Sequence, residues 1–89
     1  MARKFRLGRL LITPGAIEAM RGVSVWSYAL RHLNGDWGDL DQEDKLANER
    51  ALRDGERILS AYNLPSGERI WIITEWDRSA TTILLPEEY

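Results

Sequence analysis

The chain has 89 residues, of which 44% are hydrophobic and 29% are charged, and its formal net charge is −2 at pH 7. This length and composition predict one folded domain spanning residues 1–89 and exclude a disordered chain. The absence of cysteine excludes disulfides, thiolate metal sites and a cysteine nucleophile. No apolar run follows the charged N-terminus, and none approaches the roughly 18 residues of a membrane helix, so we expect a cytoplasmic protein that does not enter the membrane.

Charge is unevenly distributed along the chain. Residues 1–35 carry six basic side chains and one acidic side chain, whereas residues 36–89 carry six basic and thirteen acidic ones. We expect the basic first strand to lie beside the acidic part, so that the charges neutralise each other within the molecule. The alternative is nucleic-acid binding through the N-terminal bases, which are Arg3, Lys4, Arg6 and Arg9.

The first predicted elements are a strand and a short helix. Residues 5–12 are rich in leucine and isoleucine, which predicts a strand, and Gly8 in its middle indicates a bulge or the close approach of another backbone. Thr13 suits an N-cap and Pro14 suits the first helical position, so a short helix is expected over residues 14–20.

Two longer helices are expected next. Ser24 is the predicted N-cap of a helix that ends at Leu33, because its apolar residues recur with helical spacing. His32 occupies one of these apolar positions near the helix C-terminus, where the helix dipole favours the protonated imidazole. Asp41 is expected to cap the following helix, and Gly55 is expected to end it.

The C-terminal third predicts a meander of three antiparallel strands over residues 56–63, 68–76 and 80–86. The middle strand is apolar on both faces, but three short helices can cover only one. We expect loops, the N-terminal strand or another chain to shield the second face, the last as a homo-oligomer or a protein partner, and the alternative is a partly solvated Trp71. The predicted fold is α+β, with an antiparallel sheet of three to four strands and two to three helices on one face.

Residues 31–41 concentrate the side chains with reactive chemistry. This stretch holds the only histidine, His32, and the start of the densest run of acids. An imidazole with several carboxylates could hold a hard divalent cation, so a small metal-dependent hydrolase or nuclease is one hypothesis. Its residues would be His32, Asp36, Asp39, Asp41 and Asp44, with Glu75 and Asp77 from the turn after the middle strand.

Structural roles compete with this hypothesis, because caps and turns account for most of these carboxylates. His32 is expected to be half-buried and bonded to a carboxylate or a carbonyl of the following loop. Trp37 is expected to anchor that loop on the core, and Asn48 to bond loop backbone. Arg78 is expected to pair with Glu75 or with the loop acids, or to remain a surface charge.

We therefore expect a non-enzymatic module for protein interaction or regulation, and we assign no catalytic residue, metal or cofactor. The loop and the hairpin turn would form its recognition surface, provided that they are neighbours in space. The residues of that surface would be His32, Asp36, Trp37, Asp39, Glu75, Asp77 and Arg78. The sequence does not specify the protein partner.

Two motifs resemble a family of small uncharacterised bacterial proteins encoded on plasmids and integrative elements. They are RHxxGDWGD over residues 31–39 and WIITExDRSxTT over residues 71–82, and the resemblance continues over nearly the whole chain. In that family an alanine stands where this chain has Trp76. The resemblance implies a mobile-element setting, and some members carry a label of type I restriction subunit M. It implies no established activity, so no catalytic residue is carried over.

Overall fold

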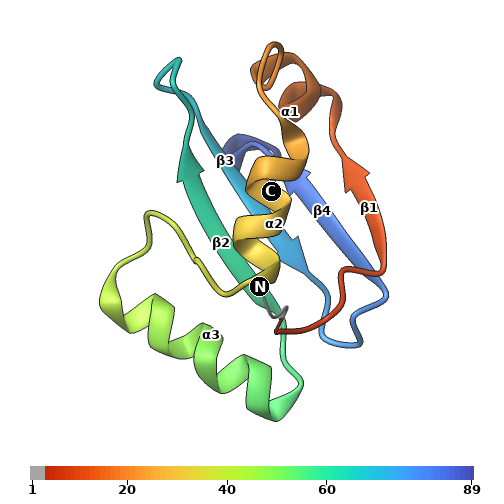
Figure 1. Ribbon diagram of the computed structural model, residues 1–89, viewed down its shortest axis with the longest axis vertical. Coiled ribbons are helices and arrows are strands. Elements are labelled where there is room, and N and C mark those ends of the chain that lie inside the picture. Colours follow the sequence, from red (N-terminus) through yellow and green to blue (C-terminus); the bar gives the residue numbers. More distant parts are fainter. Residues whose placement is uncertain (1–3) are drawn as a thin grey trace.

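The computed structural model describes residues 4–89, which form three α-helices, four strands and one short 3₁₀ helix. The strands are β1 (Arg9–Ile12), β2 (Ile58–Asn63), β3 (Arg69–Thr74) and β4 (Ala80–Leu84), and the helices are α1 (Pro14–Ala19), α2 (Val25–Leu33), α3 (Gln42–Asp54) and the 3₁₀ helix η1 (Pro86–Glu88). This arrangement confirms the α+β fold (Figure 1). None of the helices within these residues is long and apolar enough to cross a lipid bilayer.

The sheet has the strand order β1-β4-β3-β2. The C-terminal meander is antiparallel as predicted, because short turns join its three strands. The predicted antiparallel sheet is mostly so, and the one difference is that β1 pairs with β4 in parallel. All three α-helices separate β1 from β2, so no hairpin turn constrains the direction in which β1 joins the sheet.

The N-terminal strand is shorter than predicted because of Gly8. Its φ is +65°, which is not extended, and a Cβ at this position would collide with the carbonyl of Ser79. This is the close backbone approach that the sequence indicated. The strand begins only at Arg9, and the preceding segment runs past the end of α2, where the N–H of Lys4 donates to the carbonyl of Leu33 at 2.8 Å.

The basic N-terminal segment is not neutralised by ion pairs within residues 4–89. The side chains of Lys4, Arg6 and Arg9 are exposed, and the three ion pairs among the described residues involve other bases. The neighbouring strand β4 carries no acid, so sheet pairing brings β1 beside neutral residues. Arg3 lies outside the described residues.

The predicted N-caps are confirmed for all three helices. The side chains of Thr13, Ser24 and Asp41 each accept a hydrogen bond from the backbone N–H three residues later. Gly55 ends α3 in the left-handed conformation with φ +70°. These helix boundaries were predictable because a cap satisfies the free amides of the first turn with a side chain that is close in sequence.

Helices α1 and α2 cover one face of the sheet (Figure 1). The main core lies between them and the strands, and its fully buried members include Ala16, Tyr62, Ile70, Ile72 and Ile83. The isoleucines of this core come from alternate positions of β3 and from β4, as expected for one face of a pleated sheet.

The opposite face carries no α-helix within residues 4–89 and is covered by the C-terminal segment and by its own long side chains. Trp71 of β3 is half-buried and packs edge-on against Tyr89, with ring centroids 5.6 Å apart. The guanidinium of Arg57 lies 5.4 Å from the Tyr89 ring and donates to its hydroxyl at 2.6 Å. The C-terminal segment therefore supplies part of the cover that the sequence required, and Trp71 stays partly solvated.

Helix α3 closes the β2 edge of the sheet. The Asn48 side chain donates to the carbonyl of Leu59 at 2.6 Å and accepts from its N–H at 3.1 Å. Two residues further along the strand, backbone groups of residues 37–39 pair with Ala61. Asn48 thus bonds strand backbone rather than the predicted loop backbone, because α3 lies along this edge instead of on the helical face (Figure 1).

We predict that Asn48→Ala lowers the free energy of unfolding by about 2 to 3 kcal/mol, because it leaves a partly buried N–H and C=O of Leu59 without partners. Urea denaturation would measure this change. Arg50→Ala is the matched control, since Arg50 is exposed on the same helix, and its effect should stay within about 0.5 kcal/mol. Equal effects of the two substitutions would contradict this account of the edge.

Candidate functional site

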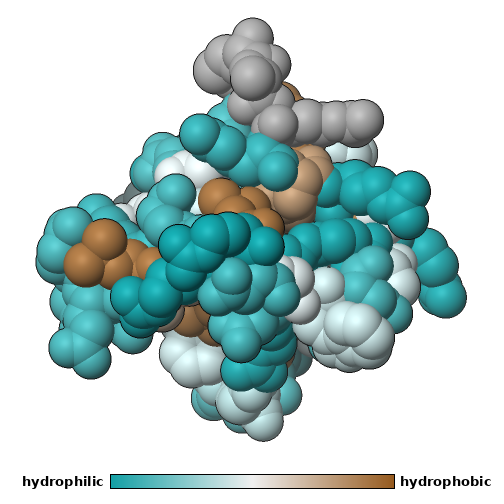
Figure 2. Space-filling view, turned by 90° about the horizontal axis from the view of Figure 1, so that it is seen from below, coloured by the Kyte–Doolittle hydropathy of each residue, from teal (hydrophilic) through white to brown (hydrophobic). Residues whose placement is uncertain are grey.

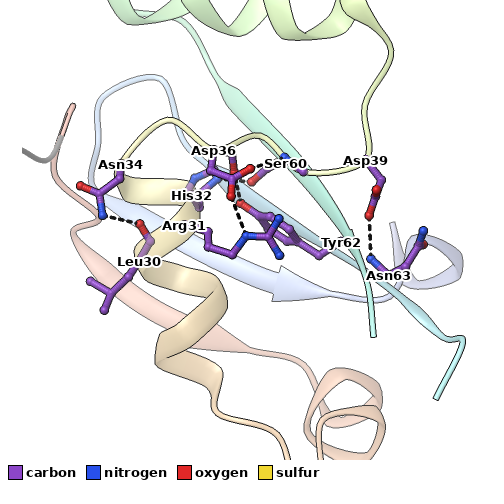
Figure 3. A network of polar contacts seen from close by, with 10 residues as sticks. Leu30, Arg31, His32, Asn34, Asp36, Asp39, Ser60, Tyr62 and Asn63 are labelled. Carbon is purple, nitrogen blue, oxygen red and sulfur yellow. Dashed lines mark hydrogen bonds and ion pairs between the residues drawn. The ribbon is translucent and has the colours of Figure 1, made fainter. Parts of the chain in front are cut away.

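The C-terminus of α2 and the loop after it form a tightly bonded surface (Figure 3). The guanidinium of Arg31 donates to the Asp36 carboxylate at 2.7 Å, and this ion pair lowers the pKa of Asp36. The Arg31 guanidinium also lies 4.6 Å from the centre of the Tyr62 ring. The Tyr62 hydroxyl donates to the Asp36 carbonyl at 2.6 Å, so strand β2 holds the loop in place.

His32 lies inside the core and is fully buried. Its Nδ1 is bonded to the hydroxyl of Ser60 and its Nε2 to that of Thr74, the latter at 2.8 Å. The chain of bonds continues from Thr74 to Thr81 at 2.7 Å and from Thr81 to the carbonyl of Leu7 at 2.7 Å. These contacts connect α2 with three strands and the N-terminal segment.

The Leu7 carbonyl, at the end of this series of hydrogen bonds, fixes the position of every proton in the series. A carbonyl only accepts, so Thr81 uses its single hydroxyl proton toward Leu7. Thr74 must then donate to Thr81, which leaves the Thr74 oxygen to accept from His32. His32 therefore carries its proton on Nε2, and Nδ1 accepts from Ser60.

Burial lowers the pKa of His32 to about 3, and the positive charge of Arg78 acts in the same direction. The imidazole is therefore neutral at pH 7. The expectation of a protonated imidazole is wrong, because burying the His32 ring away from water disfavours its charge more than the helix C-terminus stabilises it. The expected carboxylate or carbonyl partner is also wrong, since sheet hydroxyls from β2 and β3 occupy both nitrogens.

Trp37 anchors the loop, as predicted. Only 4% of its surface is exposed, and its indole N–H donates to the Glu49 carboxylate of α3 at 2.8 Å. The ring lies 5.9 Å from the His32 ring and 6.3 Å from that of Phe5, measured between centroids. Neither Trp37 nor His32 is accessible to a partner, so their assignment to the recognition surface is corrected: they support the loop from inside.

Arg78 binds backbone carbonyls rather than the predicted carboxylates. Its guanidinium donates to the carbonyls of Glu56 at 2.6 Å and Ala51 at 3.1 Å, and also to those of Glu75 and Trp76. Ala51 lies in the last turn of α3, and its carbonyl also accepts from the N–H groups of Gly55 at 2.9 Å and Glu56 at 3.0 Å. Arg78 therefore joins the β3–β4 turn to the end of α3, and its backbone has a φ of +61°.

The loop and the β3–β4 turn approach each other only in the interior. Phe5 lies between them, stacked on Trp37 and 5.8 Å from the Arg78 guanidinium. Their exposed acids have separate local partners, since Asp39 accepts from the Asn63 N–H at 3.0 Å and Asp77 from the Ser79 N–H at 3.0 Å. No hydrogen bond or ion pair within residues 4–89 joins the two sets.

The proposed metal ligands do not converge in the described part of the chain. Residues 4–89 contain no group of three histidine or acidic side chains close enough to hold a metal ion. Asp41 caps α3 by accepting from the Asp44 N–H at 2.9 Å, and Glu75 is an exposed residue of the turn. The His32 nitrogens, which would be the strongest ligands, are both hydrogen-bonded inside the core.

The structure adds a pocket that the sequence did not reveal. It is open, has a volume of about 360 Å³ and lies on the outer side of α2. Its lining residues are Ser27, Leu30, Arg31, Asn34 and Asp36.

A sequence signal for this surface existed in the helical pattern. Trp26 and Leu30 are four residues apart and lie outside the apolar positions that face the core. They are 57% and 44% exposed. In Figure 2, which views the molecule from below, most of the visible surface is hydrophilic, and hydrophobic residues appear as small separate patches. Trp26 and Leu30 place two large apolar side chains on adjacent turns of the outer side of α2.

Comparison with known proteins found no matching family model, no matching curated protein and no matching solved structure. Function is therefore inferred from the placement and chemistry of the residues themselves.

We predict that stability falls as the pH drops from about 6.5 toward 3. In this range His32 is protonated in the unfolded chain but not in the folded chain. The free energy of unfolding therefore decreases by up to about 1.4 kcal/mol for each unit that the pH falls. Above pH 6.5 His32 is neutral in both states, and its contribution is fully present. Urea denaturation at pH 7.5, 6 and 5 would measure this. The lowered pKa of Asp36 affects stability around and below its ordinary value of 3.8, which lies under the pH values of these measurements.

His32→Gln is the control for this pH dependence, because an amide forms hydrogen bonds but does not titrate. The variant should be less stable than the natural protein at pH 7.5 and should show little further loss between pH 6.5 and 5. The same loss in both proteins over that interval would show that another group causes it.

Proposed function

We propose that this protein is a non-enzymatic protein-binding module, and that its partner contacts the outer side of α2. The observation that carries the proposal is the exposure of Trp26 and Leu30, at 57% and 44%, on adjacent turns beside the pocket. Exposed apolar side chains grouped in this way are typical of sites that another protein covers.

The surroundings of these two side chains support a protein contact. Arg31, Asn34 and Asp36 border Leu30 with charged and amide groups, which gives an apolar centre with a polar rim. Arg31 is held in place by the Asp36 carboxylate and the Tyr62 ring, so binding would cost little side-chain ordering. Tryptophan and arginine are the residue types that most often dominate the binding energy of protein interfaces.

Asp36 is the residue of the sequence-based recognition surface that belongs to this proposed site. Asp39 lies three residues further on, exposed and bonded to the Asn63 N–H, and is not one of the residues that line the pocket. Asp77 and Glu75 are exposed on the separate β3–β4 turn, and their role in recognition stays a prediction. The sequence resemblance supports a partner encoded on the same mobile element.

The alternative of a metal-dependent hydrolase or nuclease has weaker support. It needs His32 as a ligand or base, yet both ring nitrogens are bonded to hydroxyls in the core. Its loop carboxylates also serve local structure, because Asp36 pairs with Arg31 and Asp41 caps α3. A neutral histidine without a free nitrogen has no lone pair to offer a metal or a proton.

The main proposal predicts that Trp26→Ala weakens binding of a purified partner at least tenfold, equivalent to about 1.4 kcal/mol or more. Affinity capture followed by titration calorimetry with the purified components would measure this. Leu46→Ala is the matched control, since Leu46 is 48% exposed on α3, and it should leave the affinity unchanged. Equal affinities for all three proteins would overturn the assignment of the surface.

Nucleic-acid binding is a second proposal, favoured by the exposure of Lys4, Arg6 and Arg9 without ion pairs among the described residues. Changing these three residues and Arg3 to glutamine should abolish binding to a short duplex, and binding by the natural protein should weaken steeply with added salt, because it releases counterions. Fluorescence anisotropy at several salt concentrations would test both. Binding that is insensitive to salt would contradict the proposal.

A further inference from the structure

The two edge strands of the sheet differ in whether their outward-facing backbone groups have hydrogen-bond partners. Along β2, the Asn48 amide and the backbone of residues 37–39 satisfy the outward-facing groups of Leu59 and Ala61. The other edge is β1, which lies free at the side of the sheet in Figure 1. An unpaired edge strand offers hydrogen-bonding groups to any extended chain, and natural proteins usually block it.

The register of β1 shows which of its groups are free. The N–H groups of Arg9 and Thr13 donate to carbonyls on the β4 side at 3.0 Å. Because backbone groups alternate in direction along a strand, those of Leu10 and Ile12 point away from the sheet. Within residues 4–89 no hydrogen bond is formed to these outward groups, and β1 contains no proline that would block pairing.

We propose that β1 pairs antiparallel with β1 of a second copy, around a two-fold axis that passes beside Leu11. Leu10 of each copy then lies opposite Ile12 of the other, and each such pair exchanges two hydrogen bonds. All outward N–H and C=O groups of Leu10 and Ile12 are satisfied by four bonds. The contact is closed and self-complementary, as in most homodimers.

Side chains favour the second copy as the occupant of this edge. Leu11 is 41% exposed on the face that carries no helix, and on the axis it meets Leu11 of the other copy. Arg9 lies opposite Thr13 of the other copy, so the basic ends of the two strands stay apart. The pairing thus covers an exposed leucine without bringing like charges together.

The backbone conformation favours this register over the two adjacent ones, which are centred on Leu10 and on Ile12. A ladder centred on Leu10 would need Gly8 in extended conformation, but its φ is +65°. A ladder centred on Ile12 would leave Leu10 opposite Pro14, which has no N–H and begins α1. Only the ladder centred on Leu11 uses both free residues of the strand.

The resulting assembly is one continuous eight-stranded sheet. Leu11 lies in register with Thr82, Ile73 and Leu59 across the helix-free face, so this row of side chains continues into the second copy. Because the shared strands have only four residues each, we expect dissociation in the range of about 1 µM to 1 mM. This edge is separate from the α2 surface, and the inference does not depend on the proposed function.

Single-cysteine variants test the contact directly, since the natural chain contains no cysteine. Opposed residues in a non-hydrogen-bonded antiparallel pair have Cα atoms about 4.5 Å apart, which lies within the range of disulfides. Leu11→Cys should therefore form a disulfide-linked dimer under mild oxidation, several-fold faster than Leu46→Cys on α3. Equal oxidation rates of the two variants would overturn the proposal.

Sedimentation equilibrium of the natural protein supplies the second test, from about 10 µM to about 1 mM. We expect Leu11→Lys and Leu11→Glu each to weaken self-association at least about tenfold, and an equal mixture of the two to restore it, because opposite charges then face each other on the axis. Leu46→Lys should associate like the natural protein. A natural protein that stays monomeric throughout would overturn the proposal, as would a mixture without recovery.

Discussion

The buried hydrogen-bond chain from Ser60 through His32, Thr74 and Thr81 to the Leu7 carbonyl holds the main layers of this protein together. Its members come from β2, α2, β3, β4 and the segment before β1. Each link satisfies a polar group that would otherwise be buried without a partner, which is costly in a core of this size. The chain also fixes one tautomer of the imidazole, so the helix can sit on the sheet in only one way that satisfies all the hydrogen bonds.

The polar groups of His32 and Arg78 are both engaged in hydrogen bonds that join separate segments of the chain. Around His32, the rings of Phe5 and Trp37 shield the end of α2 from water. The guanidinium of Arg78 donates hydrogen bonds to backbone carbonyls at the end of α3 and in the β3–β4 turn. A guanidinium is well suited to this task because it donates in several directions at once. The two interaction sites that we propose lie where side chains or backbone groups have no such partners within residues 4–89.

Two surfaces meet that description, and they differ in kind. The outer side of α2 offers apolar side chains with a charged rim, which favours a partner of complementary shape. The β1 edge offers backbone groups of Leu10 and Ile12, which any extended chain can bind and which β1 itself fits by symmetry. A dimer through β1 would leave the α2 surface of each copy available, so the assembly would present two equivalent binding sites and gain avidity for a multivalent partner.

The sequence by itself determined the helix starts, the end of α3, the antiparallel meander and the anchoring role of Trp37. These features depend on side chains and backbone groups that are near in sequence, as with Asp41 and the first turn of α3, or on a strong preference of one residue type. Only the tertiary structure decided the parallel pairing of β1, the burial and neutral state of His32, and the carbonyl partners of Arg78. Each of these depends on which distant segments are brought together, and local spacing carries no information about that choice. The separation of the loop acids from those of the β3–β4 turn has the same origin, because the sequence places chemical groups along the chain and folding alone decides which of them meet.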